Sequence, residues 1–503
     1  MAASKRFIKT LVSLCFVAIL IPALMSCNSD KAVKGKSING VTMEKFRESF
    51  ERLPIKVLTI EEITKKWPPK SGQSPAPQAP KAGEKAIPGV YIDKGKYLAK
   101  ESRREIVTAG KIEDASADGI SIKGDGGNLG GVYVKGEGQE YILSNATIEL
   151  TGEVKDMGGV TAGAAADDHG TLTLKNVNIT VTGKGRNTVS STNNSILKVY
   201  NSTLIDHGAP FEPVPLDDPS LTGASKYLEV QGNSRTTITM QNSKSYFYDS
   251  TIIGDGWGAL STDAGGEFVY MEANNCKVKT VKSGYGAYAD LLCHDTFNKC
   301  DFDVASMAIV IAGVGDATFN DTKAKCGSYF ALMHCVTGSH TEIGTLNVTG
   351  GEISCKKPAV LLRSHNADIT FDGVKLTTES GILIKTMLNP DPNATPTDGL
   401  KVYGVHAAFK NMEAAGDIIH EDPARIMSVD LKSAVLKGAI KNAYVTMDAA
   451  SKWTATGDSN IIIVGRFDGG QIDAPQGVTI TALGGEDKTY TLASGGTLII
   501  KAS

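Results

Sequence analysis

The sequence has no excess of basic residues and few aromatic ones. Its 503 residues carry 52 Lys and Arg against 55 Asp and Glu, a formal net charge of −3, and aromatic residues make up 6% of the chain. A protein that binds nucleic acid needs a basic surface to neutralise phosphates, so the charge balance argues against that class of partner. Hydrophobic residues, at 41%, are numerous enough for a sizeable core, which excludes a chain that is disordered throughout.

Several motifs of catalytic and metal-binding proteins are also missing from the sequence. No Cys-x-x-Cys pair occurs, which argues against a structural zinc site. The glycine-rich stretch Gly124–Gly130 is not followed by a helical pattern, so we expect a turn there and not a nucleotide-binding loop. No nucleophile elbow of the hydrolase type is present either.

The N-terminus carries a targeting pattern. Lys5, Arg6 and Lys9 precede an apolar run from Leu11 to Leu24. This run has the length of a signal-peptide core and is too short for a helix that spans a membrane. We therefore expect residues 1–26 to be a signal peptide.

The end of the apolar run, Leu24-Met25-Ser26-Cys27, resembles the lipobox of bacterial lipoproteins. The resemblance implies cleavage before Cys27, lipidation of its thiol and anchoring of the mature chain to a membrane. The residue that follows is Asn28 and not the Asp linked with inner-membrane retention, which favours the outer membrane as the location in the cell envelope. The alternative is an ordinary secretory signal with a coincidental cysteine.

Residues 27–89 are expected to form a tether. Phe46, Phe50 and Leu53 fall at helical spacing and predict a short helix. The stretch from Trp67 to Pro88 is rich in proline and predicts an extended, semi-rigid linker.

From about residue 90 the chain repeats a short phrase that ends in alternating polar and apolar residues. Most intervals between Asn176 and Lys325 are 24 to 26 residues, and one interval of 48 residues contains a proline-rich insertion at 209–223. A repeat of this length with three short strands predicts one coil of a solenoid. Copies of the phrase start at Ser144, Lys175, Tyr200, Tyr248, Asn274, Lys299, Lys325, Phe371 and Lys410.

This pattern resembles the right-handed parallel β-helix of pectate-lyase-like proteins. The resemblance implies an all-β solenoid over residues 90–440, with Asn side chains at successive turns bonded to one another along the stack. The segments Ser451–Ser459 and Tyr490–Leu498 resemble the closing coils of adhesin-like autotransporter passengers. We therefore expect residues 441–503 to form a C-terminal β cap.

Four cysteines recur at about one coil each. Cys276, Cys300, Cys326 and Cys355 are separated by 24, 26 and 29 residues, which predicts a single vertical ladder. Neighbouring coils lie about 4.8 Å apart, within the Cα separation that a disulfide tolerates. Two disulfides in an oxidising compartment and four buried thiols that act as small hydrophobes are both compatible with this ladder.

The strands that follow the repeated phrase align in columns of alternating face. The first and third columns are small or apolar and are expected to point inward. The second column is also apolar but shares the outer face, which predicts a covered or ligand-binding groove. The fourth column is expected to point outward as a row in which His334 neighbours Arg363 and Arg363 neighbours Lys385; it comprises Thr262, Asp290, Ala312, His334, Arg363 and Lys385.

Polysaccharide lyases of the resembled fold use Arg or Lys to remove the proton α to a uronate carboxylate, often with Ca²⁺. The resemblance implies Arg363 or Lys385 as the base, His334 as its partner and Asp290 as an orienting group or ion ligand. The segments around Trp257 and Tyr285 combine glycines with aromatic residues that can stack on sugar rings. Residues predicted to bind the substrate are Trp257, Asp263, Tyr285 and Tyr288.

The sequence thus predicts an envelope protein that binds an elongated, acidic polysaccharide and cleaves it by β-elimination. A non-catalytic, adhesin-like surface protein is the first alternative, in which the charged row is a solvated face. Other lyase or isomerase chemistry on the same scaffold is the second. Fold analogy favours a carbohydrate ligand in each case.

Overall fold

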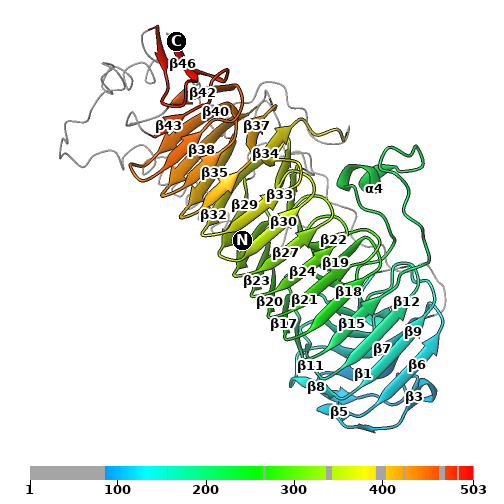
Figure 1. Ribbon diagram of the computed structural model, residues 1–503. Helices are drawn as coiled ribbons and strands as arrows, with labels where there is room; N and C mark the ends of the chain where they lie inside the picture. The colour runs from blue at the N-terminus through cyan, green and yellow to red at the C-terminus, as the bar shows by residue number, and fades with distance from the viewer. Residues whose placement is uncertain are drawn as a thin grey trace, which may run out of the picture.

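The computed structural model describes residues 85–155, 157–263, 268–335, 343–391, 404–422, 425–463, 471–483 and 487–501. The predicted signal peptide, Cys27 and nearly all of the tether lie outside these residues. Within them the chain winds into an elongated parallel β-helix whose coils stack along one axis (Figure 1). The predicted solenoid is therefore confirmed. No helix in the described ranges is long and apolar enough to cross a membrane.

Up to β37 (Asp417–His420), each complete coil contributes one strand to each of three ladders, which we name faces A, B and C; beyond it, the single strand β40 (Ile440–Met447) pairs with strands of both face A and face B. Face A contains β1 (Ile87–Asp93), β7 (Leu129–Lys135), β10 (Ala164–Asp167), β13 (Val189–Ser191), β16 (Thr237–Met240), β19 (Gly258–Asp263), β22 (Tyr285–Ala289), β25 (Ile309–Ala312), β28 (Ala331–His334), β31 (Val360–Arg363), β34 (Ile382–Met387) and β37 (Asp417–His420).

Face B follows face A along each coil. It contains β5 (Ser116–Asp118), β8 (Tyr141–Ser144), β11 (Thr171–Lys175), β14 (Ile196–Tyr200), β17 (Lys244–Tyr248), β20 (Val269–Asn274), β23 (Cys293–Asn298), β26 (Asp316–Asn320), β29 (Ile343–Thr349), β32 (Asn366–Asp372), β35 (Gly404–Lys410), β38 (Ile426–Lys432), β40 (Ile440–Met447), β42 (Ser459–Ile463), β44 (Thr479–Leu483) and β46 (Thr497–Lys501).

Face C is a separate sheet of 15 strands among the described residues. It contains β3 (Val107–Thr108), β6 (Ser121–Asp125), β9 (Thr147–Thr151), β12 (Asn178–Thr182), β15 (Thr203–Asp206), β18 (Thr251–Gly254), β21 (Lys277–Thr280), β24 (Asp301–Val304), β27 (Lys323–Cys326), β30 (Glu352–Cys355), β33 (Lys375–Thr378), β36 (Glu413–Ala415), β39 (Val435–Lys437), β41 (Lys452–Thr454) and β43 (Ile472–Asp473).

Antiparallel pairs occur at both ends of the stack. At one end, β2 (Lys96–Tyr97) pairs with β1, β3 with β6, and β4 (Lys111–Ile112) with β5, near the short helix η1 (Arg104–Ile106). At the other end, β45 (Lys488–Thr491) pairs with β46. Antiparallel pairing of this kind shields the open edge of a stack of parallel strands.

The turn from face B to face C is the most regular feature of each coil. It holds a residue with positive φ, at 56° in Asn176, 53° in Asn275 and 50° in Asn411. The predicted amide stack is confirmed in part: Asn176 Nδ2 donates to Asn145 Oδ1 at 3.2 Å, whereas Asn275 Nδ2 donates to a carboxylate, Asp249 Oδ1, at 2.6 Å. Asn tolerates the left-handed conformation because its short amide bonds locally.

The predicted four-cysteine ladder is wrong. Cys276 and Cys300 stack at the turn between faces B and C, whereas Cys326 and Cys355 are paired neighbours at the ends of β27 and β30. The cause is one short coil: the turn residues Lys299 and Asp321 are only 22 residues apart. The repeated phrase at Lys325 therefore falls on strand β27 and not on a turn.

The interior is filled by inward-facing aliphatic and phenylalanine side chains. The ring of Phe319 contacts Phe297 and Phe330, with ring centroids 4.6 and 5.0 Å away respectively. Phe371 and Phe409 stack with their ring centroids 5.8 Å apart. All five rings are buried. A column of this kind gives each coil the apolar contact that it cannot make alone.

The positive-φ turns predict a graded loss of stability on substitution. Asn275→Ala removes the amide bond and places a Cβ in the left-handed region, so we expect a loss of about 2 kcal/mol. Asn275→Gly is the matched control: it keeps the backbone conformation available and is expected to cost about 1 kcal/mol or less. The midpoint of urea unfolding measures both, and equal losses would contradict the role given to backbone conformation.

Candidate functional site

The predicted site residues all come from face A or the turns beside it. Pairing of β28 with β31 places His334 and Arg363 side by side, as predicted. In β25 the inward residues Ile309 and Ile311 belong to the main core, whereas Val310 belongs to a separate apolar cluster outside it. The predicted alternation of faces is thus correct for the middle of face A.

Two alignments at the ends of this row are wrong. Lys385 pairs with Leu361, and Arg363 pairs with Met387, because β34 starts two residues before Ile384, the residue that pairs with the first residue of β31, Val360. Lys385 therefore does not neighbour Arg363 in the outer row, and its amine lies 3.1 Å from Glu421 instead.

Strand β19 is offset by one residue from the predicted column. Thr262 pairs with Ala289 and points inward, where its hydroxyl donates to the buried Asp295 at 2.9 Å. Asp263 directly follows Thr262 in the sequence, and Asp290 directly follows Ala289. The offset therefore brings two carboxyl side chains together on adjacent coils.

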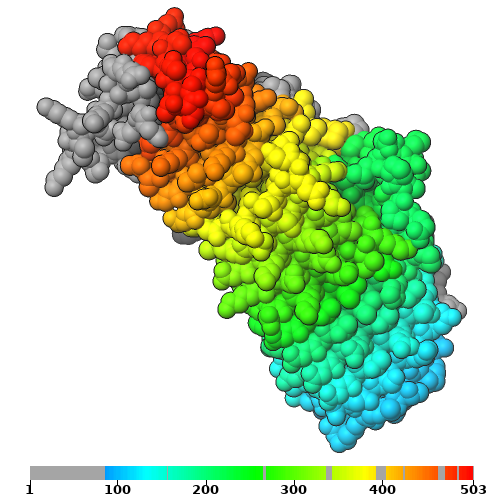
Figure 2. Space-filling view, in the orientation of Figure 1, coloured from blue at the N-terminus to red at the C-terminus, as the bar shows by residue number. Residues whose placement is uncertain are grey.

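An insertion of the chain covers the outer apolar row of face A. We call residues 209–230 the strap; it includes the helix α4 (Gly223–Leu228). Figures 1 and 2 show the α4 region as a protrusion on one side of the β-helix. Leu228 and Val230 of the strap pack against an outer cluster of face A and its adjoining turns, which consists of Tyr285, Met307, Val310, Tyr329, Leu332 and Leu361.

Glu229 fastens the strap to face A. Its carboxylate is ion-paired with Arg363 and with Lys357, the latter at 2.7 Å. The hydroxyl of Tyr329 donates to the same carboxylate at 3.2 Å, and Arg363 also donates to the backbone carbonyl of Tyr227. We call Glu229, Tyr329, Lys357, Arg363 and the adjacent His334 the Arg363 centre.

The Arg363 centre has more positive than negative charge. Among the described residues, the two cations Arg363 and Lys357 share the single carboxylate of Glu229. Arg363 and His334 are buried, and neither Arg363 Nε nor His334 Nε2 has a hydrogen-bond partner. Buried polar atoms are usually satisfied, so these two atoms mark a place where a polar ligand would be stabilised.

Burial controls the protonation of His334. Burial, together with the neighbouring His365 and Arg363, lowers the pKa of His334 to about 3. The imidazole is therefore neutral at physiological pH, and it adds no charge to the centre.

A second polar centre lies on the same face, toward the N-terminal end. Arg235 donates to Asp263 Oδ2 at 2.8 Å and to the hydroxyl of Tyr285 at 3.1 Å. The Tyr285 hydroxyl in turn lies 3.0 Å from Ser261 Oγ. We call Arg235, Ser261, Asp263, Tyr285 and Asp290 the Asp290 centre.

The two aspartates of this centre differ in their surroundings. Arg235 neutralises Asp263, and although burial opposes it, Tyr285 and Asp263 raise the pKa of Arg235. Burial and the hydrogen-bonded neighbour Asp263 raise the pKa of Asp290 to about 8. Asp290 is thus a carboxylic acid that stays protonated near neutral pH and can donate a hydrogen bond.

The aromatic residues predicted to bind sugar are placed unevenly. Tyr285 is fully buried, and its ring fills the space beside Gly258, so it is a packing residue in this structure. Trp257 and Tyr288 are half-buried and border the outer apolar cluster. Sequence reasoning missed Arg235, Glu229 and Lys357, of which only Glu229 had a signal: it belongs to the same long insertion as the proline-rich segment at 209–223.

In the described ranges, no group of three or more His, Cys, Asp or Glu side chains is arranged to hold a metal ion. In the strap, Asp218 accepts a hydrogen bond from the backbone of Ser220 at 2.8 Å. In the second proline-rich loop, Asn389 accepts one from the backbone of Asp391 at 3.0 Å.

The Glu229 contacts predict a pH-dependent strap. Burial opposes ionisation of Glu229, but Arg363 and Lys357 outweigh it and lower its pKa. A carboxylate with a lowered pKa stabilises the folded state above its unfolded value and loses that contribution as pH falls through the folded value. We therefore expect amide exchange in Gly223–Val230 to increase only below about pH 4.

The variant Glu229→Gln is expected to speed amide exchange in the same segment at neutral pH. The free energy needed to open the segment should fall by about 2 kcal/mol, because the variant loses charge-assisted hydrogen bonds. Glu212→Gln is the control, because Glu212 lies in the same strap but is 87% exposed. Equal exchange in both variants would contradict the fastening role of Glu229.

No protein-family model, no curated protein and no solved structure matches this chain. The function therefore has to be argued from the two centres on face A.

Proposed function

We propose that this protein binds an elongated, acidic polysaccharide along face A, with the Arg363 centre holding sugar carboxylates. The observation that carries the proposal is the charge imbalance there: Arg363 and Lys357 share one carboxylate, and two buried donor or acceptor atoms have no partner. A ligand carboxylate would supply both the missing charge and the missing hydrogen bonds.

The order in which a ligand would meet the two cations follows from the exposed fractions of their side chains. Lys357 is 38% exposed, whereas Arg363 is 7% exposed and lies behind Glu229. A polysaccharide carboxylate would first meet Lys357 and would reach Arg363 by competing with Glu229. Binding would then loosen the strap, whose own apolar contacts run along the outer cluster of face A.

Cleavage by β-elimination is the second candidate function, and Asp290 is the observation that favours it. A carboxyl group with a raised pKa on the proposed binding face is typical of a functional site, and it can donate to one uronate carboxylate of a bound chain. Asp290 lies three coils from Arg363, so the reaction itself would occur on another sugar unit. There Arg363, which is ion-paired and remains protonated, binds the carboxylate, and Lys385 on the next coil takes the α proton while the glycosidic oxygen at C4 leaves and is protonated by solvent. An adhesin-like role corresponds to binding at the same face without this reaction.

Binding is tested with the full mature chain and soluble polygalacturonate or alginate. Lys357→Met is expected to weaken binding about tenfold, equivalent to about 1.4 kcal/mol, and added salt is expected to weaken it further. Lys325→Met is the matched control, because Lys325 is an exposed lysine on face C. Equal affinity of the Lys357 variant and the wild type would contradict the proposal.

The same samples separate cleavage from binding. Absorbance in the unsaturated-uronate band is followed with Ca²⁺ and with chelator. A rise that Lys385→Met abolishes would establish elimination beside the Arg363 centre, and a weaker effect of Asp290→Asn would fit its contact with a different sugar unit. Binding without such a rise would leave a non-catalytic polysaccharide receptor.

We also propose that the mature chain is anchored to the cell envelope through a lipid on Cys27, as its lipobox-like sequence implies. Cys27→Ser is expected to abolish incorporation of labelled fatty acid and to move the protein from the membrane fraction to the soluble fraction. Ser26→Thr keeps the cysteine and is the control. Fatty-acid labelling that persists in the Cys27 variant would contradict the anchor.

A further inference from the structure

A stretch of face B carries outward-facing aromatic residues on three adjacent coils. Tyr200 and Tyr248 stack with ring centroids 4.8 Å apart, and Tyr246 and Tyr270 lie 5.8 Å apart. These four side chains are half-buried, on strands β14, β17 and β20. The chain has few aromatic residues, so their concentration on one outer surface sets this part of face B apart.

A recess of about 380 Å³ lies where these strands begin. It is formed by the start of β14, the turn before β17 and the residue that precedes β20. The residues that line it are Asn194, Ser195, Ile196, Asn242, Lys244 and Phe268.

The polar groups of the recess are partly unused. Asn242 Nδ2 donates to Asn194 Oδ1 at 2.6 Å, which leaves the other atom of each amide outside this bond. Ser195 is only 1% exposed, yet its hydroxyl has no hydrogen-bond partner. Because Ser195 Oγ is itself buried, the amides of Asn194 and Asn242 are the polar groups of the recess that a ligand can reach.

Charge and an aromatic surface complete the recess. Lys244 is exposed and forms no ion pair within the described part of the chain. Phe268 is 45% exposed, and one face of its ring lies on His294 at a centroid distance of 4.8 Å. Phe268 is also one of the residues that line the recess.

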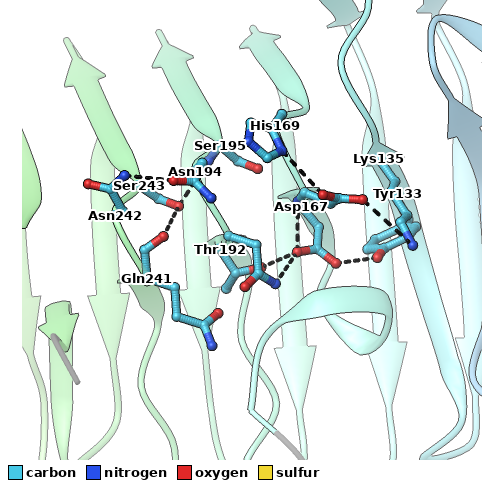
Figure 3. A network of polar contacts seen from close by, with 12 residues as sticks. Tyr133, Lys135, Asp167, His169, Thr192, Asn194, Ser195, Gln241, Asn242 and Ser243 are labelled. Carbon is cyan, nitrogen blue, oxygen red and sulfur yellow. Dashed lines mark hydrogen bonds and ion pairs between the residues drawn. The ribbon is translucent and has the colours of Figure 1, made fainter. Parts of the chain in front are cut away.

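The nearby carboxylates are already engaged (Figure 3). Asp167 accepts hydrogen bonds from Tyr133, from Thr192 at 2.9 Å and from Asn193 at 2.7 Å. Asp168 lies within ion-pair distance of Lys135 and His169. Among the described residues that line the recess, Lys244 is the charged one, and the site therefore favours an anion.

We propose that this recess binds a single sugar unit that carries a carboxylate, with the ring stacked on Phe268 and the carboxylate at Lys244. The amides of Asn194 and Asn242 are the hydrogen-bonding partners of the sugar hydroxyls. Aromatic stacking together with a few fixed polar groups is the usual composition of a small-ligand site. The site lies on face B, separate from the Arg363 centre on face A, and does not depend on the function proposed for that centre.

The test uses the full mature chain with hexagalacturonate and, as the uncharged probe, maltohexaose, followed by calorimetry and by ligand saturation-transfer NMR. Phe268→Ala is expected to weaken hexagalacturonate binding at least tenfold, whereas Phe268→Tyr keeps the ring and binding. Lys244→Met is expected to reduce the preference for the charged probe over the uncharged one.

A set of outcomes separates this site from the Arg363 centre. Loss of binding in Phe268→Ala but not in Lys357→Met supports the recess on face B alone. If the wild type has two binding sites and each variant loses one of them, both sites are supported. Unchanged binding in Phe268→Ala and Lys244→Met overturns the inference, whatever Lys357→Met does. Absence of binding to either probe by the wild type overturns it as well.

Discussion

Parallel backbone pairing from one coil to the next is the constraint on which the rest of this structure depends. Every strand of faces A, B and C in the middle of the stack is hydrogen-bonded to the equivalent strands of the coils before and after it. Register is therefore transmitted along the axis, and the left-handed turn residues with their amide bonds keep the coils aligned. Any side chain that points outward is placed in a column, and chemistry on the surface arises from which residues share that column.

The two centres on face A are consequences of this arrangement. Asp263 and Asp290 meet because they follow paired residues on adjacent coils. His334 and Arg363 meet because β28 and β31 are of equal length and in register. The strap adds what the periodic coils cannot: Glu229 comes from an insertion and reaches across 134 residues of sequence to Arg363.

The sequence was sufficient to predict the coil, the turn stack and the central pair His334 and Arg363, since these depend on local repetition and strand alternation. It was not sufficient for Lys385, because the alternating apolar residues of β34 fit equally well when the strand is moved by two residues against β31. It also missed the short coil before Asp321, which divides the cysteines into two separate pairs. Contacts of the non-periodic strap, such as Glu229 with Lys357, have no sequence period from which to be inferred.

The central claim is that face A holds the carboxylates of an acidic polysaccharide at the Arg363 centre. The most direct measurement is a crystal structure of the mature chain with a bound acidic hexasaccharide. The account predicts sugar carboxylates within ion-pair distance of Lys357 and Arg363, with the bond between Glu229 and Arg363 broken. A bound oligosaccharide that leaves the strap fastened and touches neither cation would contradict it.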